Sequence, residues 1–286
     1  MVCRLDSEPW EIRDVTHYPD SRDMDFRRSF TAIAGKLYVS GCDEMKIYDL
    51  TGNTWKKGKK PLNYAEWQAS AASSSSLFNC GGCEYSDNLL YSNYYTSTLV
   101  AQQWVFRYDT VKDEWSRLRD MKHARLEAGA IHLQSSNVLH VIGGAQNLLQ
   151  FPFIGRLRRR SDRHERLDLR TSSWEELKEL PKGRASPALA FHKEMIVMAG
   201  GKDKFDSPNN NVWGYDIRMD SWREMPSMKK CRHRHGLISL GENLYAIGGK
   251  GEASMEVFDG RSWENVPVTH DDFNDCMHGC QMISAE

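Results

Sequence analysis

The chain alternates short apolar stretches with polar, turn-forming segments, and this alternation repeats. In each copy a Tyr or apolar residue is followed by an Asp, a polar segment and a Trp. Four full copies are YDLTGNTW, YDTVKDEW, LDLRTSSW and YDIRMDSW, which end at Trp55, Trp115, Trp174 and Trp222. Two shortened copies, LDSEPW and FDGRSW, end at Trp10 and Trp263. Because Asp with Gly, Asn, Ser or Lys favours a tight turn, each copy predicts a strand, a turn and a second strand.

A second repeated element is an apolar stretch that runs into two glycines. The copies LFNCGG, VLHVIGG, MIVMAGG and LYAIGG end at Gly82, Gly144, Gly201 and Gly249. A fifth copy, LYVSGC, ends at Cys42 and lacks the second glycine. Glycine tolerates positive φ and close approach of another backbone segment. The element therefore predicts a strand that ends in a reversal of the chain.

The two elements alternate along nearly the whole chain with a period of about 50 residues, and together they resemble the kelch motif. The resemblance implies an all-β fold, a kelch-type β-propeller of four-stranded blades around a central axis. It predicts a single domain over residues 1–286. The expected blades are 27–60, 65–120, 125–180, 184–226, 232–268, and a closing blade made from 1–20 and 270–286.

The number of blades follows less directly, because six Trp elements accompany five glycine elements. The tail sequence CMHGCQMI is similar to CRHRHGLISL, which begins an earlier repeat. In kelch-like proteins the last strand of the chain commonly closes the first blade, and here the segment VCRLD and the strand at Trp10 supply the outer half of one. We therefore expect six blades with an incomplete closing blade formed by the two chain ends. A five-bladed ring is the alternative.

Composition and charge exclude several classes of partner. Lys and Arg number 38 against 39 Asp and Glu, a formal charge of −1, so no global field favours nucleic acid or an anionic membrane. No apolar run reaches the roughly 18 residues of a membrane-spanning helix, and the first residues lack an apolar signal core. The seven cysteines are irregularly spaced, which favours free thiols in a reducing compartment. We expect a cytoplasmic protein.

Candidate metal and catalytic sites are weak in this sequence. Cys80 and Cys83 have the spacing of half a zinc site, and Cys276 with Cys280 offers a second half, but the repeat already explains the glycines between the first pair. His233 and His235 are expected at the rim of the channel among arginines, whose charge opposes binding of a cation. We find no residue set like those of the copper- or iron-dependent kelch enzymes. The expectation is a protein without cofactor or metal that is not an enzyme.

The kelch resemblance also implies a binding face. In kelch-like proteins, an Arg at the start of each innermost strand and the residues just after Gly-Gly contact the ligand. These positions fall on Arg125, Arg184, Arg232, Lys202 and Lys250, with His235 nearby, with Arg27 or Arg28 in the first repeat, and with Ala65 and neighbouring Trp67 in the second. Cations that converge on one mouth suit a partner with an acidic motif. The alternative is that these arginines tie neighbouring loops together.

Two long segments follow the second and third glycine elements. The first, residues 83–104, is rich in tyrosine, and the second, residues 145–168, contains a run of arginines. Aromatic and basic loop residues favour protein interfaces. The candidate contacts are Tyr94, Tyr95, Arg158 and Arg159. The alternative is a pair of ordinary insertions with solvated charges, and the arginine run alone does not indicate a nucleic-acid site.

These observations predict a protein–protein interaction module that recognises a partner or substrate protein, as in kelch-like adaptors of Cullin-3 ubiquitin ligases. The sequence carries no BTB or BACK region, so contact with Cullin-3 itself is expected only indirectly. The alternatives are an actin-associated kelch protein and a metal-dependent kelch-fold enzyme.

Overall fold

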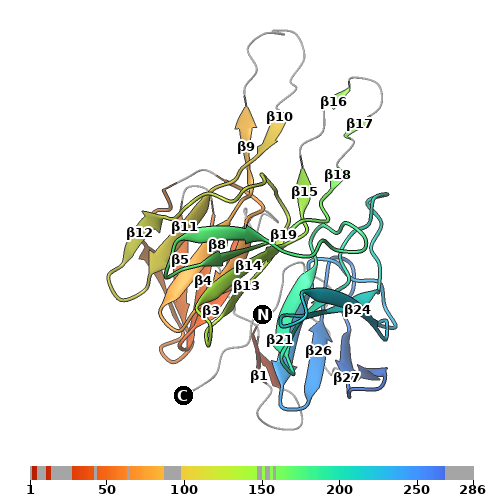
Figure 1. Ribbon diagram of the computed structural model, residues 1–286. Helices are drawn as coiled ribbons and strands as arrows, with labels where there is room; N and C mark the ends of the chain where they lie inside the picture. The colour runs from red at the N-terminus through yellow and green to blue at the C-terminus, as the bar shows by residue number, and fades with distance from the viewer. Residues whose placement is uncertain are drawn as a thin grey trace.

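The computed structural model describes residues 2–4, 11–13, 28–41, 44–62, 65–86, 98–146, 150–151, 155–156 and 159–267, and every regular element among them is a β-strand. Five antiparallel sheets of four strands each form a propeller (Figure 1). The all-β propeller predicted from the repeats is confirmed. None of the described residues belongs to a helix long and apolar enough to cross a bilayer.

The blades follow one another along the chain. Blade one comprises β3 (Ser29–Ile33), β4 (Lys36–Ser40), β5 (Met45–Asp49) and β6 (Thr54–Gly58). Blade two comprises β7 (Ala69–Ala72), β8 (Ser76–Cys80), β11 (Val105–Asp109) and β12 (Glu114–Arg117). Blade three comprises β13 (Gly129–Leu133), β14 (Val138–Ile142), β19 (His164–Asp168) and β20 (Ser173–Glu176). Blade four comprises β21 (Ala188–His192), β22 (Met195–Ala199), β23 (Val212–Asp216) and β24 (Ser221–Met225). Blade five comprises β25 (Gly236–Leu240), β26 (Asn243–Ile247), β27 (Met255–Phe258) and β28 (Trp263–Val266).

The remaining strands form small two-stranded sheets. In blade two β9 (Cys83–Ser86) pairs with β10 (Thr98–Ala101), and in blade three β15 (Ala145–Gln146) pairs with β18 (Arg159–Arg160), and β16 (Gln150–Phe151) with β17 (Gly155–Arg156). Near the N-terminus β1 (Val2–Arg4) pairs with β2 (Glu11–Arg13). These two strands belong to the segment predicted to supply the outer half of a sixth blade. The predicted inner half, 270–286, lies outside the described residues, which contain five complete blades.

The Tyr-Asp element makes the turn between the third and fourth strands. In blade four, Oδ1 of Asp216 accepts hydrogen bonds from the backbone N–H of Arg218 and Met219. The hydroxyl of Tyr215 donates to Oδ1 of Asp220, 2.7 Å away, and Asp220 has a positive φ of 45°. Asp tolerates this left-handed conformation better than most residues, so the motif stabilises its own turn.

The Trp element joins blades two to five each to the preceding blade. The indole N–H of Trp115 in blade two donates to the carbonyl of Lys59 at 2.9 Å, and that of Trp174 in blade three donates to Arg119 at 2.8 Å. Trp222 and Trp263 repeat the contact in blades four and five. Each interface between consecutive blades also has its own cluster of buried apolar residues. The core is therefore distributed between the blades.

In blades two, three and four, the Gly-Gly pair is where the blade receives the backbone of the next one. In blade three, the N–H of Gly144 donates to the carbonyl of Arg184 in blade four, 2.6 Å away. Gly143 has φ of +67°, and a Cβ added there would lie 2.6 Å from the same carbonyl oxygen. Any larger residue would both strain the backbone and collide with the next blade.

The innermost strands of consecutive blades pack side by side and line a central channel of about 470 Å³. Much of its wall consists of small side chains, such as Ala71, Ala130 and Ala190. The lining of the channel extends to the end of the propeller where the Gly-Gly pairs lie, and it includes Arg28, Trp67 and His235, which the sequence singled out.

Candidate functional site

Two sets of loops meet at one end of the propeller, which we name the Gly-Gly end. One set follows the Gly-Gly pairs and the other leads into the innermost strands. Backbone bridges between Leu126 and Ala145 and between Ala185 and Lys202 join the two sets within a blade. The hairpins β9–β10 and β15–β18 also rise from this end (Figure 1). The arrangement places residues from several blades around one opening.

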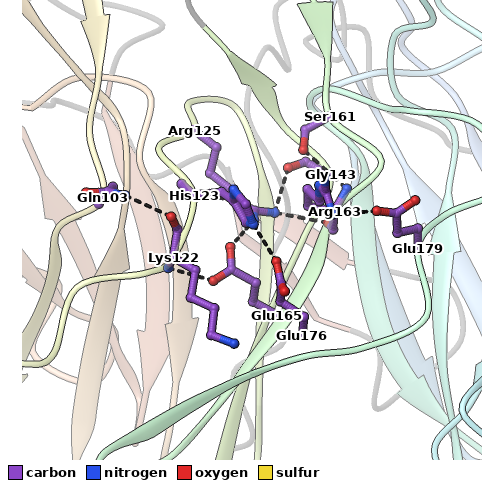
Figure 2. A network of polar contacts seen from close by, with 10 residues as sticks. All are labelled: Gln103, Lys122, His123, Arg125, Gly143, Ser161, Arg163, Glu165, Glu176 and Glu179. Carbon is purple, nitrogen blue, oxygen red and sulfur yellow. Dashed lines mark hydrogen bonds and ion pairs between the residues drawn. The ribbon is translucent and has the colours of Figure 1, made fainter.

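Arg125 of blade three is buried, with an exposed fraction of 0%, and its guanidinium is bound within its own blade (Figure 2). It forms an ion pair with Glu165 on β19 and donates to the carbonyls of Gly143 and Arg163, at 3.1 and 3.0 Å. The second carboxylate oxygen of Glu165 accepts the backbone N–H of Lys122 at 2.7 Å. This network joins the loop before β13 to the second and third strands.

Blade five repeats the same construction around Arg232. The guanidinium of Arg232 donates to Glu256 on β27 at 3.0 Å, and to the carbonyls of Gly248 and Ser254, each at 2.7 Å. The carboxylate of Glu256 also accepts the backbone N–H of Lys229 at 2.6 Å. Arg232 and Glu256 are both fully buried.

Blade four has the arginine without the glutamate. Arg184 donates to Oδ1 of Asn211 at 3.0 Å, whereas Trp213 occupies the position on β23 that glutamate has in blades three and five. Among the described residues Arg184 forms no ion pair, and burial lowers its pKa below the ordinary value for arginine. In blade two both partners are replaced by apolar residues, Ala65 and Phe106.

The structure does not place the predicted rim arginines at the rim. Arg125, Arg184 and Arg232 have exposed fractions of 0%, 3% and 1%. Arg125 and Arg232 donate to the carbonyls of Gly143 and Gly248, the first glycines of their Gly-Gly pairs, whereas Arg184 donates to Asn211. Arg125 and Arg232 connect segments of their own blades through these hydrogen bonds. Arg28 occupies a different position: it directly precedes β3 and pairs with Glu44 at 2.8 Å. Partner contacts of these four residues remain untested.

In blades two to five, the residue that lies at the mouth of the channel stands two positions after Ala65, Arg125, Arg184 or Arg232. Trp67, Glu127, Ser186 and Arg234 all have left-handed backbone conformation, with φ of 55°, 53°, 51° and 56°. Their backbones form a relay in which the N–H of Glu127 donates to Trp67, that of Ser186 to Glu127, and that of Arg234 to Ser186. All four line the channel. We name these residues the mouth quartet.

Side chains of the mouth quartet meet across the opening. The guanidinium of Arg234, from blade five, donates to Oε1 of Glu127, from blade three, at 2.9 Å. It also lies over the ring of Trp67, from blade two, with 6.0 Å between the guanidinium carbon and the ring centroid. An ion pair and a cation–π contact thus connect three blades at one point.

The three remaining predicted residues of the mouth differ in exposure. Lys202 is half-buried and pairs with Asp206 at 3.4 Å, whereas Lys250 is exposed. His235 is buried, and desolvation together with the charge of Arg232 lowers its pKa to about 3. His235 is therefore neutral at physiological pH and contributes no charge to the mouth.

The candidates in the long segments are only partly placed. Tyr94, Tyr95 and Arg158 lie outside the described residues. Arg159 lies on β18 and is exposed, and the next residue, Arg160, is buried. Each awaits a direct test of partner binding.

Sequence reasoning missed Glu127 and did not select Arg234. Their signal was positional, since each stands two residues after an arginine of the repeat. The left-handed backbone that points them into the mouth depends on hydrogen bonds between blades, which the local sequence does not reveal.

The described residues contain no group of three or more His, Cys, Asp or Glu side chains placed to hold a metal ion. Cys80 and Cys83 both lie in the interior, and burial raises the pKa of Cys80 to about 12. The other half of the conceivable zinc site, Cys276 and Cys280, lies outside the described residues.

Known proteins resemble the chain through its repeats. A kelch motif matches residues 183–229. Kelch-like protein 36 of Rattus norvegicus is 27% identical over 163 residues, which cover 56% of this chain and 25% of that protein. Kelch-like protein 8 of Caenorhabditis elegans is 40% identical over 68 residues, covering 23% of this chain and 10% of that protein. Alpha-scruin of Limulus polyphemus is 29% identical over 106 residues, covering 32% and 11%.

The matched segment is thus about a quarter of the first of these relatives, so the comparison concerns the repeat region and not a whole protein. The motif match, the relatives and the five four-stranded blades agree with one another. The chain is a kelch-repeat β-propeller that resembles the C-terminal propeller of the kelch-like proteins.

Proposed function

We propose that the chain binds a partner protein at the Gly-Gly end of the propeller, and that it acts by binding and not by catalysis. The observation that carries the proposal is the mouth quartet. A left-handed backbone costs a non-glycine residue roughly 1–2 kcal/mol, yet the four positions hold Trp, Glu, Ser and Arg. Strain of this kind concentrates at functional sites.

The chemistry of the quartet fits protein recognition. Trp67 and Arg234 belong to residue types that are enriched at binding hot spots. The four residues of the mouth quartet share one backbone conformation while their side chains differ. The repeated backbone therefore presents a different side chain from each blade. Lys202, Lys250 and Arg159 lie at the same end and supply positive charge for acidic groups of a partner.

In its more specific form, the proposal is that the partner is a substrate protein presented to a ubiquitin ligase, as in kelch-like adaptors. The partial match to Kelch-like protein 36 supports this form at the level of the repeats.

The proposal is tested with the double variant Trp67→Ala/Arg234→Gln beside Met219→Ala. Met219 is 73% exposed on the turn between β23 and β24, at the opposite end of the propeller, and is the matched control. Proteins retained from lysate by the parent chain are identified, purified and titrated against each variant, with folding checked by circular dichroism.

We expect the double variant to lose at least about thirtyfold in affinity, the effect of one hot spot, and the control to bind like the parent. Equal binding by a correctly folded double variant would show that the mouth is not the site. Co-sedimentation with filamentous actin would favour the cytoskeletal alternative. Stoichiometric copper or iron in the purified chain would favour an enzyme.

A further inference from the structure

The loop that follows the Gly-Gly pair of blade four is held rigidly by its own hydrogen bonds. The N–H of Asp203 donates to the carbonyl of Ser207 at 3.0 Å, and the N–H of Asp206 donates to that of Asp203 at 3.1 Å. Oδ1 of Asp203 accepts the N–H groups of Phe205 and Ser207, at 2.9 and 3.1 Å. The backbone around Phe205 is therefore fixed in one conformation.

Blade three fixes the same loop from outside. Nε of Arg160, on β18, donates to the carbonyl of Asp203 at 2.9 Å, and the guanidinium forms an ion pair with Asp206. Lys202 contributes a second cation to Asp206 at 3.4 Å. The Arg160 side chain is only 3% exposed, whereas the carboxylate side chain of Asp206 is 62% exposed. The buried Arg160 of the neighbouring blade thus supports the loop from outside, and we name this contact the buttress of the loop.

This rigid loop presents a large apolar side chain to solvent. Phe205 is 75% exposed, although Phe is among the residue types most often buried. The ammonium group of Lys204 lies 4.9 Å from the centroid of its ring. Lys204 forms no ion pair with the described residues, so its charge is available to a partner. An aromatic ring and a cation thus stand together at the Gly-Gly end.

Pre-organisation gives this arrangement its value in binding. A partner that covers Phe205 gains the burial of an aromatic side chain, and the loop loses little conformational entropy because it is already ordered. A flexible loop would lose part of that gain on ordering. Exposed, rigidly held aromatic anchors are typical of interface hot spots.

We propose that Phe205 is an anchor that inserts into an apolar pocket of the partner protein, and that this pocket carries a carboxylate facing Lys204. The inference rests on the proposed function, because it assumes that the Gly-Gly end binds a protein. It goes further by assigning the anchor, the shape of the complementary site and its charge.

The test places the photoreactive residue p-benzoylphenylalanine at Phe205, at Met219 or at Lys250 in the full chain, and irradiates each protein in cells. The cross-linked segments are identified by mass spectrometry. We expect the adduct from position 205 to map to an apolar pocket that contains Asp or Glu, and position 219 to give no such adduct. The absence of an adduct at 205, or an adduct to a flat polar surface, overturns the proposal.

The purified partner is then titrated against Phe205→Ala, Phe205→Tyr, Lys204→Glu and Met219→Ala. We expect Phe205→Ala to weaken binding at least about thirtyfold, Lys204→Glu about tenfold, and Phe205→Tyr and Met219→Ala less than about threefold. Unchanged affinity of Phe205→Ala refutes the anchor. If position 250 cross-links and position 205 does not, the Phe205 anchor is wrong while the proposed function stands. If the double variant Trp67→Ala/Arg234→Gln also binds the partner like the parent chain, the anchor and the proposed function both fail.

Discussion

Arg234 of blade five and Glu127 of blade three form an ion pair of 2.9 Å across the channel mouth, past Ser186 of the blade between them. The pair connects blades that are not neighbours in the ring. It also neutralises the two charges of the mouth quartet against each other. An acidic group of a partner must therefore compete with Glu127 for Arg234, whose guanidinium also lies over the neutral ring of Trp67.

The buried pair of Arg125 and Glu165 predicts a large loss of stability when one partner is removed. Replacing Arg125 by Met leaves the carboxylate of Glu165 buried without its cation, and we expect the free energy of unfolding to fall by about 3–5 kcal/mol. The double variant Arg125→Met/Glu165→Leu should recover much of this loss, because apolar residues occupy the equivalent positions in blade two. Urea denaturation measures both.

The control for this experiment is a surface pair that joins β19, the strand of Glu165, to β20. Arg166 and Glu175 pair at 2.7 Å with exposed fractions of 34% and 58%. Arg166→Met should cost less than about 1 kcal/mol. A cost for Arg125→Met as small as that of the control would contradict the structural role assigned to the buried arginine.

The sequence was sufficient for the repeats because their determinants are local. Asp216 caps its own turn, and Tyr215 binds the turn residue Asp220 five positions later. Alternation of such elements predicts the strands directly. The interior role of the arginines was not predictable in the same way, since Arg125 is buried by Glu165, which lies on a strand beyond a long insertion.

The mouth and the Phe205 loop depend on contacts between blades. The left-handed Arg234 donates its backbone N–H to the carbonyl of Ser186 in blade four, and the Phe205 loop accepts a hydrogen bond from Arg160 in blade three. Neither contact follows from the repeat pattern, because these residues lie where one copy of the motif differs from another.

The tryptophan contact between blades predicts that Trp174→Ala destabilises the propeller more than Trp174→Phe does. Trp174 of blade three is 9% exposed and donates its indole N–H to Arg119 of blade two. Trp174→Ala removes both the packing and the hydrogen bond, and should cost about 3–5 kcal/mol. Trp174→Phe keeps an aromatic ring and should cost less. Thermal unfolding followed by circular dichroism gives the order; equal losses for the two variants would mean that ring packing at this interface contributes little.

Buried histidines predict that the propeller loses stability in acid. His140 and His164 lie 2.9 Å apart between Nδ1 and Nε2, and burial lowers the pKa of His140 to about 3 and that of His164 well below its ordinary value. Both are neutral when folded and take up protons near pH 6.5 when unfolded. Their contribution to stability is therefore complete above about pH 6.5 and declines as the pH falls towards about 3.

The measurement is urea denaturation between pH 7.5 and 4.5 for the parent and for His140→Gln. Each such histidine contributes a slope of up to about 1.4 kcal/mol per pH unit below pH 6.5, so the variant should show a shallower decline. Parallel curves for the two proteins would show that His140 does not remain neutral in the folded state.

The buttress of the Phe205 loop predicts a change in dynamics that does not depend on any partner. Arg160→Ala removes the donor to the Asp203 carbonyl and the ion pair with Asp206, while the loop keeps its internal hydrogen bonds. We expect the amides of Phe205 and Ser207 to exchange with deuterium at least about tenfold faster, because local opening becomes less costly.

Amides on β22 of the same blade serve as the internal reference and should keep their rates. Arg159→Ala, which alters an exposed neighbour on β18, is the matched control. If Arg160→Ala leaves exchange in the loop unchanged, the rigidity of Phe205 comes from the loop alone; if it also speeds exchange on β22, the substitution has loosened the whole blade and the buttress is not specific to the loop.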